Sequence, residues 1–205
     1  MNDAQQERGG TGQDAAGADR RRAGFRTRLI TMLITLTAVF VLTVTAGLWV
    51  VATGAYDVAA TEEHWPITDW ALNTLQHRSV AARAGDLPVP IPDDPAALDH
   101  GFEHFHAMCV ECHGAPGFDR GDSGQGLNPE PPRLEEEAHE WTDAELFWIT
   151  RHGIRLAGMP AFGPTHTDEE IAGIVAFIRA MEEMTEEEYA ERVRLLEAGE
   201  AMHEH

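Results

Sequence analysis

The sequence predicts an all-α protein made of one N-terminal membrane-spanning helix and a small helical domain behind it. Residues 29–53 contain 25 residues without a charged side chain, enough to cross a bilayer core as a helix. Two Thr-x-x-Glu capping boxes, beginning at Thr142 and Thr167, precede apolar residues at helical spacing. Only two cysteines occur, which excludes a disulfide framework as the basis of the fold.

Charges on the two sides of the span predict its orientation. The flanking charges are Arg20, Arg21, Arg22, Arg26 and Arg28 before the span and Asp57, Glu62 and Glu63 after it. The positive-inside rule therefore places residues 1–28 in the cytoplasm, where their Gly, Ala, Gln and Asp content predicts a disordered tail. The alternative is a signal peptide cleaved near residues 58–60. A retained anchor is favoured because a signal's apolar region is usually only about 7–15 residues long.

The part beyond the span is strongly acidic. Residues 54–205 carry nine arginines and 31 acidic residues, a net charge of −22, and the chain contains no lysine. This charge disfavours nucleic acid or a membrane surface as a partner and favours a protein with a basic docking face. The alternative interpretation is that the acidic excess keeps the domain soluble.

Residues 54–92 are predicted to form a juxtamembrane helix followed by a proline-rich linker. Residues 61–84 show helical spacing, with Pro66 in the first turn and Asp69 as a cap. Prolines alternate with apolar residues at 87–92, which predicts an extended, semi-rigid segment that holds the next domain at a defined distance from the membrane.

Residues 93–184 are predicted to form the compact domain. An Asp-Pro pair at 94–95 is an N-cap and first-turn pair that opens a helix toward Met108. The two capping boxes open a short helix and a longer one. The longer helix has an apolar stripe of Ile171, Ile174, Val175 and Ile178. Residues 185–205 are expected to form an acidic C-terminal tail helix that frays.

Cys109-Val110-Glu111-Cys112-His113 is the most informative stretch, because Cys-x-x-Cys-His is the attachment signature of a c-type haem. On a helical turn, Cys109 and Cys112 share a face, so that each thiol reaches one vinyl group and His113 ligates the iron. A zinc site would require two further Cys or well-spaced His residues, and a thioredoxin-like pair would require a βαβ setting. Haem attachment takes place outside the cytoplasm, which agrees with the predicted orientation.

The pattern Gly-x-x-x-Phe-x-x-x-Cys-x-x-Cys-His at residues 101–113 resembles the opening of class I cytochromes c. In that family the glycine and the aromatic residue cross a C-terminal helix, whose packing face Ile174 and Phe177 match. The sequence Gly-Met-Pro-Ala-Phe at 158–162 resembles the family's distal-ligand loop, which implies that Met159 is the sixth iron ligand.

The resemblance covers about residues 93–182 and implies a class I cytochrome c fold, with three to four helices around one covalent haem. The single-haem, anchored arrangement is similar to that of bacterial membrane-bound cytochromes. Two features depart from the best-known members: a long insert at residues 117–140, and the anchor. The resemblance implies one haem c with His and Met as axial ligands. It also implies location at the bacterial cytoplasmic membrane, with the haem domain in the periplasm.

Ligand chemistry favours Met159 independently. A thioether is a soft ligand that suits haem iron, and the flanking glycine and proline present it from a stiff loop. Competing residues are Met108, which is interpreted as helix packing, Met181 and Met184 at the last helix, and His152 and His166.

The surroundings of the haem are predicted as follows. The other ring nitrogen of His113 needs an acceptor, expected from a carbonyl in residues 131–134. Arg133 or Arg155 is a candidate partner for a haem propionate, and Trp148 is a candidate pocket wall. The histidines at 100–106 and 202–205 could form a copper or nickel site, but solvated polar faces are commoner.

These features predict a carrier that transfers one electron at a time between membrane-bound and extracytoplasmic redox proteins. Six-coordinate iron leaves no position for a substrate, so neither an enzyme activity nor a small-molecule substrate is expected. One alternative is a fixed cytochrome subunit of a dehydrogenase, oxidase or reductase complex. A further alternative is a haem sensor or peroxidase-like protein in which Met159 leaves the iron.

Overall fold

The computed structural model describes residues 3–85, 87–89, 91–92, 94–155 and 157–203, with side chains between Gly24 and Gly199. Within these ranges the structure is helical, with no β-strand and only two isolated bridges, Ala115–Phe118 and Ile154–Met159. The all-α prediction is thus confirmed. The chain divides into two units, residues 1–58 and 59–205, which are treated separately.

The first unit is the long helix α1, Asp3–Thr53. Its segment Gly24–Thr53, which contains an 18-residue window of mean hydropathy 2.3, is long and apolar enough to cross a membrane. The Oγ1 atoms of Thr31, Thr35 and Thr43 donate to carbonyls four residues earlier, at 2.9–3.0 Å. These bonds satisfy the hydroxyls within the helix, so the threonines are compatible with a span.

The helical backbone of α1 also includes residues 3–28, where the sequence predicts a disordered tail. Extending an existing helix fixes one residue for each hydrogen bond gained, whereas starting one fixes several residues for the first bond. The apolar span therefore provides a helix end from which the polar segment continues.

The second unit begins with α2, Pro66–Ala84, which packs against α7, Asp143–His152. The helix starts five residues later than predicted, because the residue before a proline disfavours helical dihedrals and Trp65 has ψ 140°. Asp69 lies in the first turn and does not cap the helix.

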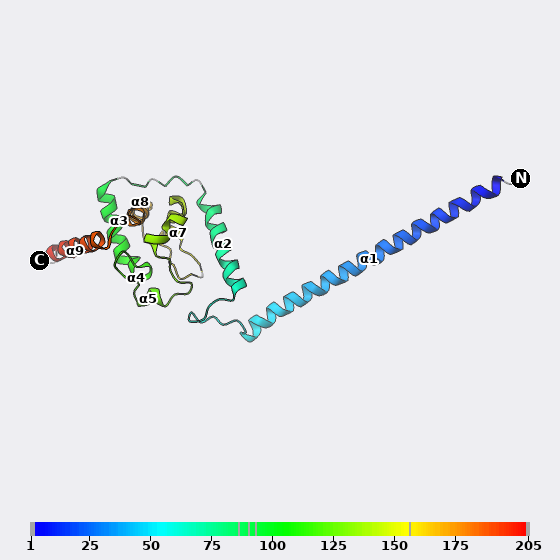
Figure 1. Ribbon diagram of the computed structural model, residues 1–205, viewed down its shortest axis with the longest axis horizontal. Helices are drawn as coiled ribbons and strands as arrows, with labels where there is room; N and C mark the ends of the chain where they lie inside the picture. The colour runs from blue at the N-terminus through cyan, green and yellow to red at the C-terminus, as the bar shows by residue number, and fades with distance from the viewer. Residues whose placement is uncertain (1–2, 86, 90, 93, 156, 204–205) are drawn as a thin grey trace. The chain divides into compact units, whose positions relative to one another are not determined.

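The described part of the proline-rich segment 87–92 lies along the domain and does not act as a spacer. Val89 and Ile91 pack against the hydrophobic core. Figure 1 shows this segment running from the end of α2 to the start of α3. Burial of the apolar residues between the prolines explains the difference from the predicted linker.

The centre of the domain is the crossing of α3, Pro95–Met108, with α8, Asp168–Met181 (Figure 1). Both helices have the predicted caps, including Asp94, whose side chain accepts from the amides of the first turn. A Cβ built on Gly101 would lie 2.1 Å from the Gly173 carbonyl oxygen, so only glycine permits this approach. The predicted apolar stripe of α8 is buried, and the Phe105 and Phe177 rings are 5.4 Å apart.

The insert at residues 117–140 contains three short elements: α5, Asp122–Gln125; α6, Leu134–Glu137; and the 3-10 helix η1, Ala138–Glu140. Arg179 of α8 ties this region to the core. Its Nη1 donates to the Ala138 carbonyl at 2.9 Å, and its Nε donates to Asp143 at 2.7 Å.

The C-terminal helix α9, Glu186–His203, is more firmly packed than the predicted fraying tail. Tyr189 is fully buried, and its hydroxyl lies 3.0 Å from His106 Nδ1. Arg192 pairs with Asp99 of α3 at 2.7 Å. The first half of α9 is therefore part of the core.

Candidate haem-attachment site

The Cys-x-x-Cys-His motif forms one helical turn, α4, Val110–His113, that continues directly from α3. The Cys109 amide donates to the Phe105 carbonyl at 2.8 Å, and the His113 amide donates to the Cys109 carbonyl at 2.9 Å. Cys109 is buried and Cys112 is half-buried. The fold thus provides the helical turn that the spacing of the motif predicts.

The His113 ring is oriented by a hydrogen bond from Nδ1 to the Pro132 carbonyl oxygen, at 2.8 Å. Since a carbonyl only accepts, Nδ1 carries the proton and Nε2 keeps its lone pair. Burial lowers the pKa of His113, opposed by this hydrogen bond, so the neutral form that can ligate a metal is favoured. The predicted acceptor within residues 131–134 is confirmed.

The insert packs against the attachment motif at Glu111 and Cys112. The Gly121 amide donates to the Glu111 carbonyl at 2.9 Å, and the Ser123 amide donates to the Glu111 carboxylate at 3.2 Å. A Cβ on Gly124 would lie 2.7 Å from the Cys112 carbonyl oxygen. The insert therefore braces the attachment turn, a role that sequence reasoning missed although the glycines at 121 and 124 were a signal for close backbone approach.

Two arginines hold the segment that supplies the Pro132 carbonyl. Arg120 pairs with Glu130 and donates to the Pro131 carbonyl at 2.6 Å. Arg133 donates to Glu135 at 2.8 Å and to the Ala115 carbonyl at 3.1 Å. The guanidinium of Arg133 is thus already engaged within the protein, whereas Arg155 is exposed. Propionate pairing by either arginine stays a prediction.

Met159 lies half-buried in the loop between α7 and α8, after Gly158, whose φ is +76°. The Ile154 amide donates to the Met159 carbonyl at 3.2 Å, which closes a short loop that ends at the methionine. A Cβ on Gly158 would lie 2.6 Å from Leu127 Cδ2, so the insert also contacts this loop. The positive φ favours glycine at 158.

The competing ligands occupy other environments. Met181 is fully buried, and Met108 and Met184 pack partly buried against the core. His166 Nδ1 lies 2.9 Å from the Thr165 hydroxyl, and His152 is exposed beside the Trp148 ring, at 4.8 Å between centroids. Met181, at the end of α8, is thus core packing.

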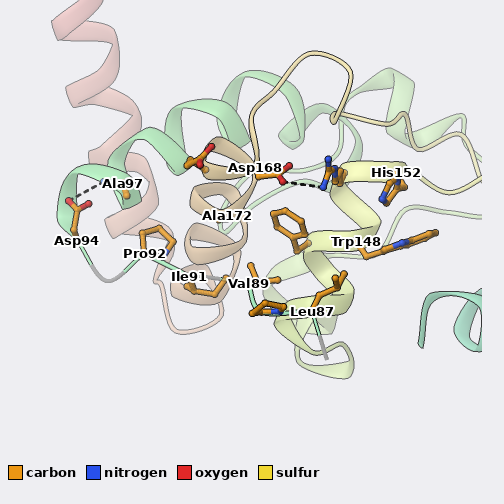
Figure 2. Close-up of a pocket in the computed structure, with 14 residues that line it drawn as sticks. Leu87, Val89, Ile91, Pro92, Asp94, Ala97, Trp148, His152, Asp168 and Ala172 are labelled. Carbon is orange, nitrogen blue, oxygen red and sulfur yellow. Dashed lines mark hydrogen bonds and ion pairs between the residues drawn. The ribbon is translucent and has the colours of Figure 1, made fainter. Parts of the chain in front are cut away.

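The cavity drawn in Figure 2, about 840 Å³, lies where the segment 87–92 meets α7 and α8. Trp148, His152 and Phe147 line it, and none of the four predicted haem-binding residues does. Trp148 thus lines a cavity, but its role as a haem-pocket wall stays a prediction.

Burial distinguishes the Cys109 thiol from the reactive thiol of a redox pair. Burial raises the pKa of the Cys109 thiol to about 12, with Cys112 adding to the rise, whereas redox pairs depend on a thiol of lowered pKa. Among the described residues, no three His, Cys, Asp or Glu side chains are grouped to hold a metal ion. The histidine tail predicted as an alternative metal site lies outside the described side chains.

Residues 96–178 match the model of the family described as cytochrome c oxidase, cbb3-type, subunit III. This segment is a cytochrome c domain. The resemblance to class I cytochromes c is thereby confirmed. Such a domain carries haem c and transfers electrons, and its residues fit that group: two thiols on one turn, and an imidazole whose free nitrogen is set by a hydrogen bond.

A curated relative is the quinohemoprotein alcohol dehydrogenase of Comamonas testosteroni, 28% identical over 132 residues. The match covers 62% of this chain and 18% of the relative. The chain thus corresponds to less than a fifth of that protein, so the similarity extends to a part of it and not to the whole enzyme.

Proposed function

We propose that this protein is a membrane-anchored monohaem cytochrome c that passes one electron at a time between membrane-bound and extracytoplasmic redox proteins. The observation that carries the proposal is the His113 hydrogen bond to Pro132 on the turn that also holds both cysteines. This hydrogen bond supports the role of His113 as the proximal iron ligand, because the second ring nitrogen of a ligating histidine almost always donates its N–H to such an acceptor.

In this proposal each site residue has a separate task. Cys109 and Cys112 form the two thioether bonds, and His113 and Met159 are the axial ligands. When bound, the haem supplies the one-electron chemistry. The Pro132 carbonyl holds the imidazole in one tautomer, and the stiff loop after Gly158 presents the thioether. Neither task requires a substrate position, so the proposed protein is a carrier and not an enzyme in its own right.

The proposed location follows from the span and the flanking charges. The segment Gly24–Thr53 supports a single-pass anchor, and the arginines before it support a cytoplasmic N-terminus. The haem domain then lies in the periplasm or its equivalent. Its net charge favours redox partners with a basic docking face.

A second candidate is a cytochrome subunit fixed in a larger oxidoreductase complex. The matching family is described as an oxidase subunit, and the curated relative is a dehydrogenase. Purification from membranes in mild detergent separates the two candidates. A mobile carrier is expected to elute alone at the size of one chain with detergent. Elution with other proteins in constant ratio would contradict the carrier and support the fixed subunit.

A further inference from the structure

The helix α2 has two different faces. Leu72, Gln76 and Ser79 are half-buried, and Val80 and Ala84 are buried, so this side faces the domain. The opposite side, called here the outer face of α2, is exposed. It consists of Ile67, Trp70, Ala71, Thr74, Leu75, Arg78, Ala81 and Ala82. The three large apolar side chains of this face are Ile67, Trp70 and Leu75, which are 65%, 64% and 63% exposed.

The outer face differs in charge from the rest of the domain. It contains no acidic residue, although residues 54–205 carry 31, and its single charged side chain is Arg78. Grouped exposed apolar side chains mark an interaction surface in a soluble domain. Because this surface lacks carboxylates, it does not suit a partner that recognises the domain through its acidic residues.

The connection to the span limits what this face can meet. α1 ends at Thr53 and α2 begins at Pro66, so 12 residues join them. Even fully extended, these reach only about 40 Å. If α1 is an anchor, α2 is therefore held at high effective concentration beside the bilayer surface.

We infer that the outer face of α2 binds the lipid surface of the membrane that α1 crosses, with Ile67, Trp70 and Leu75 at the headgroup boundary. Tryptophan is enriched at that depth, and aliphatic residues beside an arginine are typical of helices that lie in the interface. The inference rests on the proposed anchor. Since α2 packs on α7, lipid contact orients the domain and leaves its other sides for redox partners.

The test uses single introduced cysteines. In the proposed holoprotein both native cysteines are bonded to haem, so a new thiol can be spin-labelled alone. Leu75→Cys reports on the outer face. Asn73→Cys is the matched control, since Asn73 is also exposed and lies nearly opposite on the helix. The full-length holoprotein is placed in phosphatidylcholine vesicles, and collisions with oxygen and with a water-soluble nickel chelate are measured.

We expect the label at 75 to lose relaxation by the chelate and gain relaxation by oxygen, relative to the label at 73. Equal chelate access at both positions would overturn the inference. Protection of position 75 in native membranes but not in lipid vesicles would also overturn it, and would indicate a protein partner. Failure of the protein to sediment with vesicles would instead refute the anchor. Absence of the haem spectrum from the purified wild-type protein would refute the carrier proposal.

Discussion

Leu127 of the insert packs against Gly158, the residue before Met159, so closely that a Cβ on Gly158 would lie 2.6 Å from Leu127 Cδ2. The Leu127 amide donates to the Gly124 carbonyl at 3.3 Å, and Gly124 in turn lies against Cys112. The insert therefore links the attachment turn to the methionine loop, two parts of the proposed haem site that are far apart in sequence.

Leu127→Ala is expected to loosen the methionine loop without removing haem. Truncating a half-buried leucine costs about 1–2 kcal/mol of stability. The charge-transfer band of iron–thioether ligation, at the red edge of the visible spectrum, should disappear at lower temperature than in the wild type. Leu195→Ala, at a position 64% exposed, is the control and should leave this temperature unchanged. If the band disappeared at the same temperature in both variants, the contact between Leu127 and Gly158 would not support the loop.

Met159→Ala is expected to abolish the same band. It should also lower the reduction potential, since the ferrous state loses its soft ligand, and should open the iron to carbon monoxide. Optical spectra and redox titration measure these changes. Met108→Ala should keep all three properties and cost at most about 2–5 kcal/mol of packing. If the band survived in Met159→Ala and was lost in a His152 or His166 variant, the ligand assignment would be wrong.

Replacement of both Cys109 and Cys112 by alanine is expected to eliminate covalent haem, because both thioether bonds lose their sulfur. A haem stain on a denaturing gel measures the outcome. The apoprotein should be largely unfolded in circular dichroism, since a domain of this size has a small core. Haem that survived denaturation in the double variant would contradict the central proposal.

Gly101→Ala is expected to destabilise the domain by about 1–3 kcal/mol or more, because its methyl group would overlap the Gly173 carbonyl at the helix crossing. Denaturant titration of the holoprotein measures the loss. Gly199→Ala is the matched control: nothing lies within 4 Å of its added Cβ, and helical alanine should be about 0.5–1 kcal/mol more stable than glycine. Similar unfolding midpoints for the two variants would contradict the close crossing.

A reporter that works only outside the cytoplasm is expected to be active when fused after His205 and inactive when fused before Met1. The physical reason is the excess of arginine on the N-terminal side of the span. The opposite pattern would reverse the proposed topology. A mature N-terminus near Thr61, found by sequencing the purified protein, would show that the span is a cleaved signal.

Local sequence patterns were sufficient to predict many structural elements of this protein. The uncharged run of 25 residues, the caps at Asp94, Thr142 and Thr167, and the apolar stripe of α8 were predictable because each depends on residues within a few positions. The helical turn of the attachment motif was also predictable, since the spacing of its residues is that of one turn of helix. The roles of Cys109, Cys112 and Met159 remain predictions that the variants above test, and the role of His113 also remains a prediction.

Only the tertiary structure decided how distant segments meet. It selected Pro132 as the His113 acceptor, placed the insert against Cys112 and Gly158, and buried Tyr189 of the predicted tail. It also packed Val89 and Ile91 of the predicted linker onto the core. Periodicity shows that a segment has an apolar face, but the surface that covers this face is set by packing between remote parts of the chain. The linker and the tail were therefore mistaken for independent segments, because their burial depends on that packing.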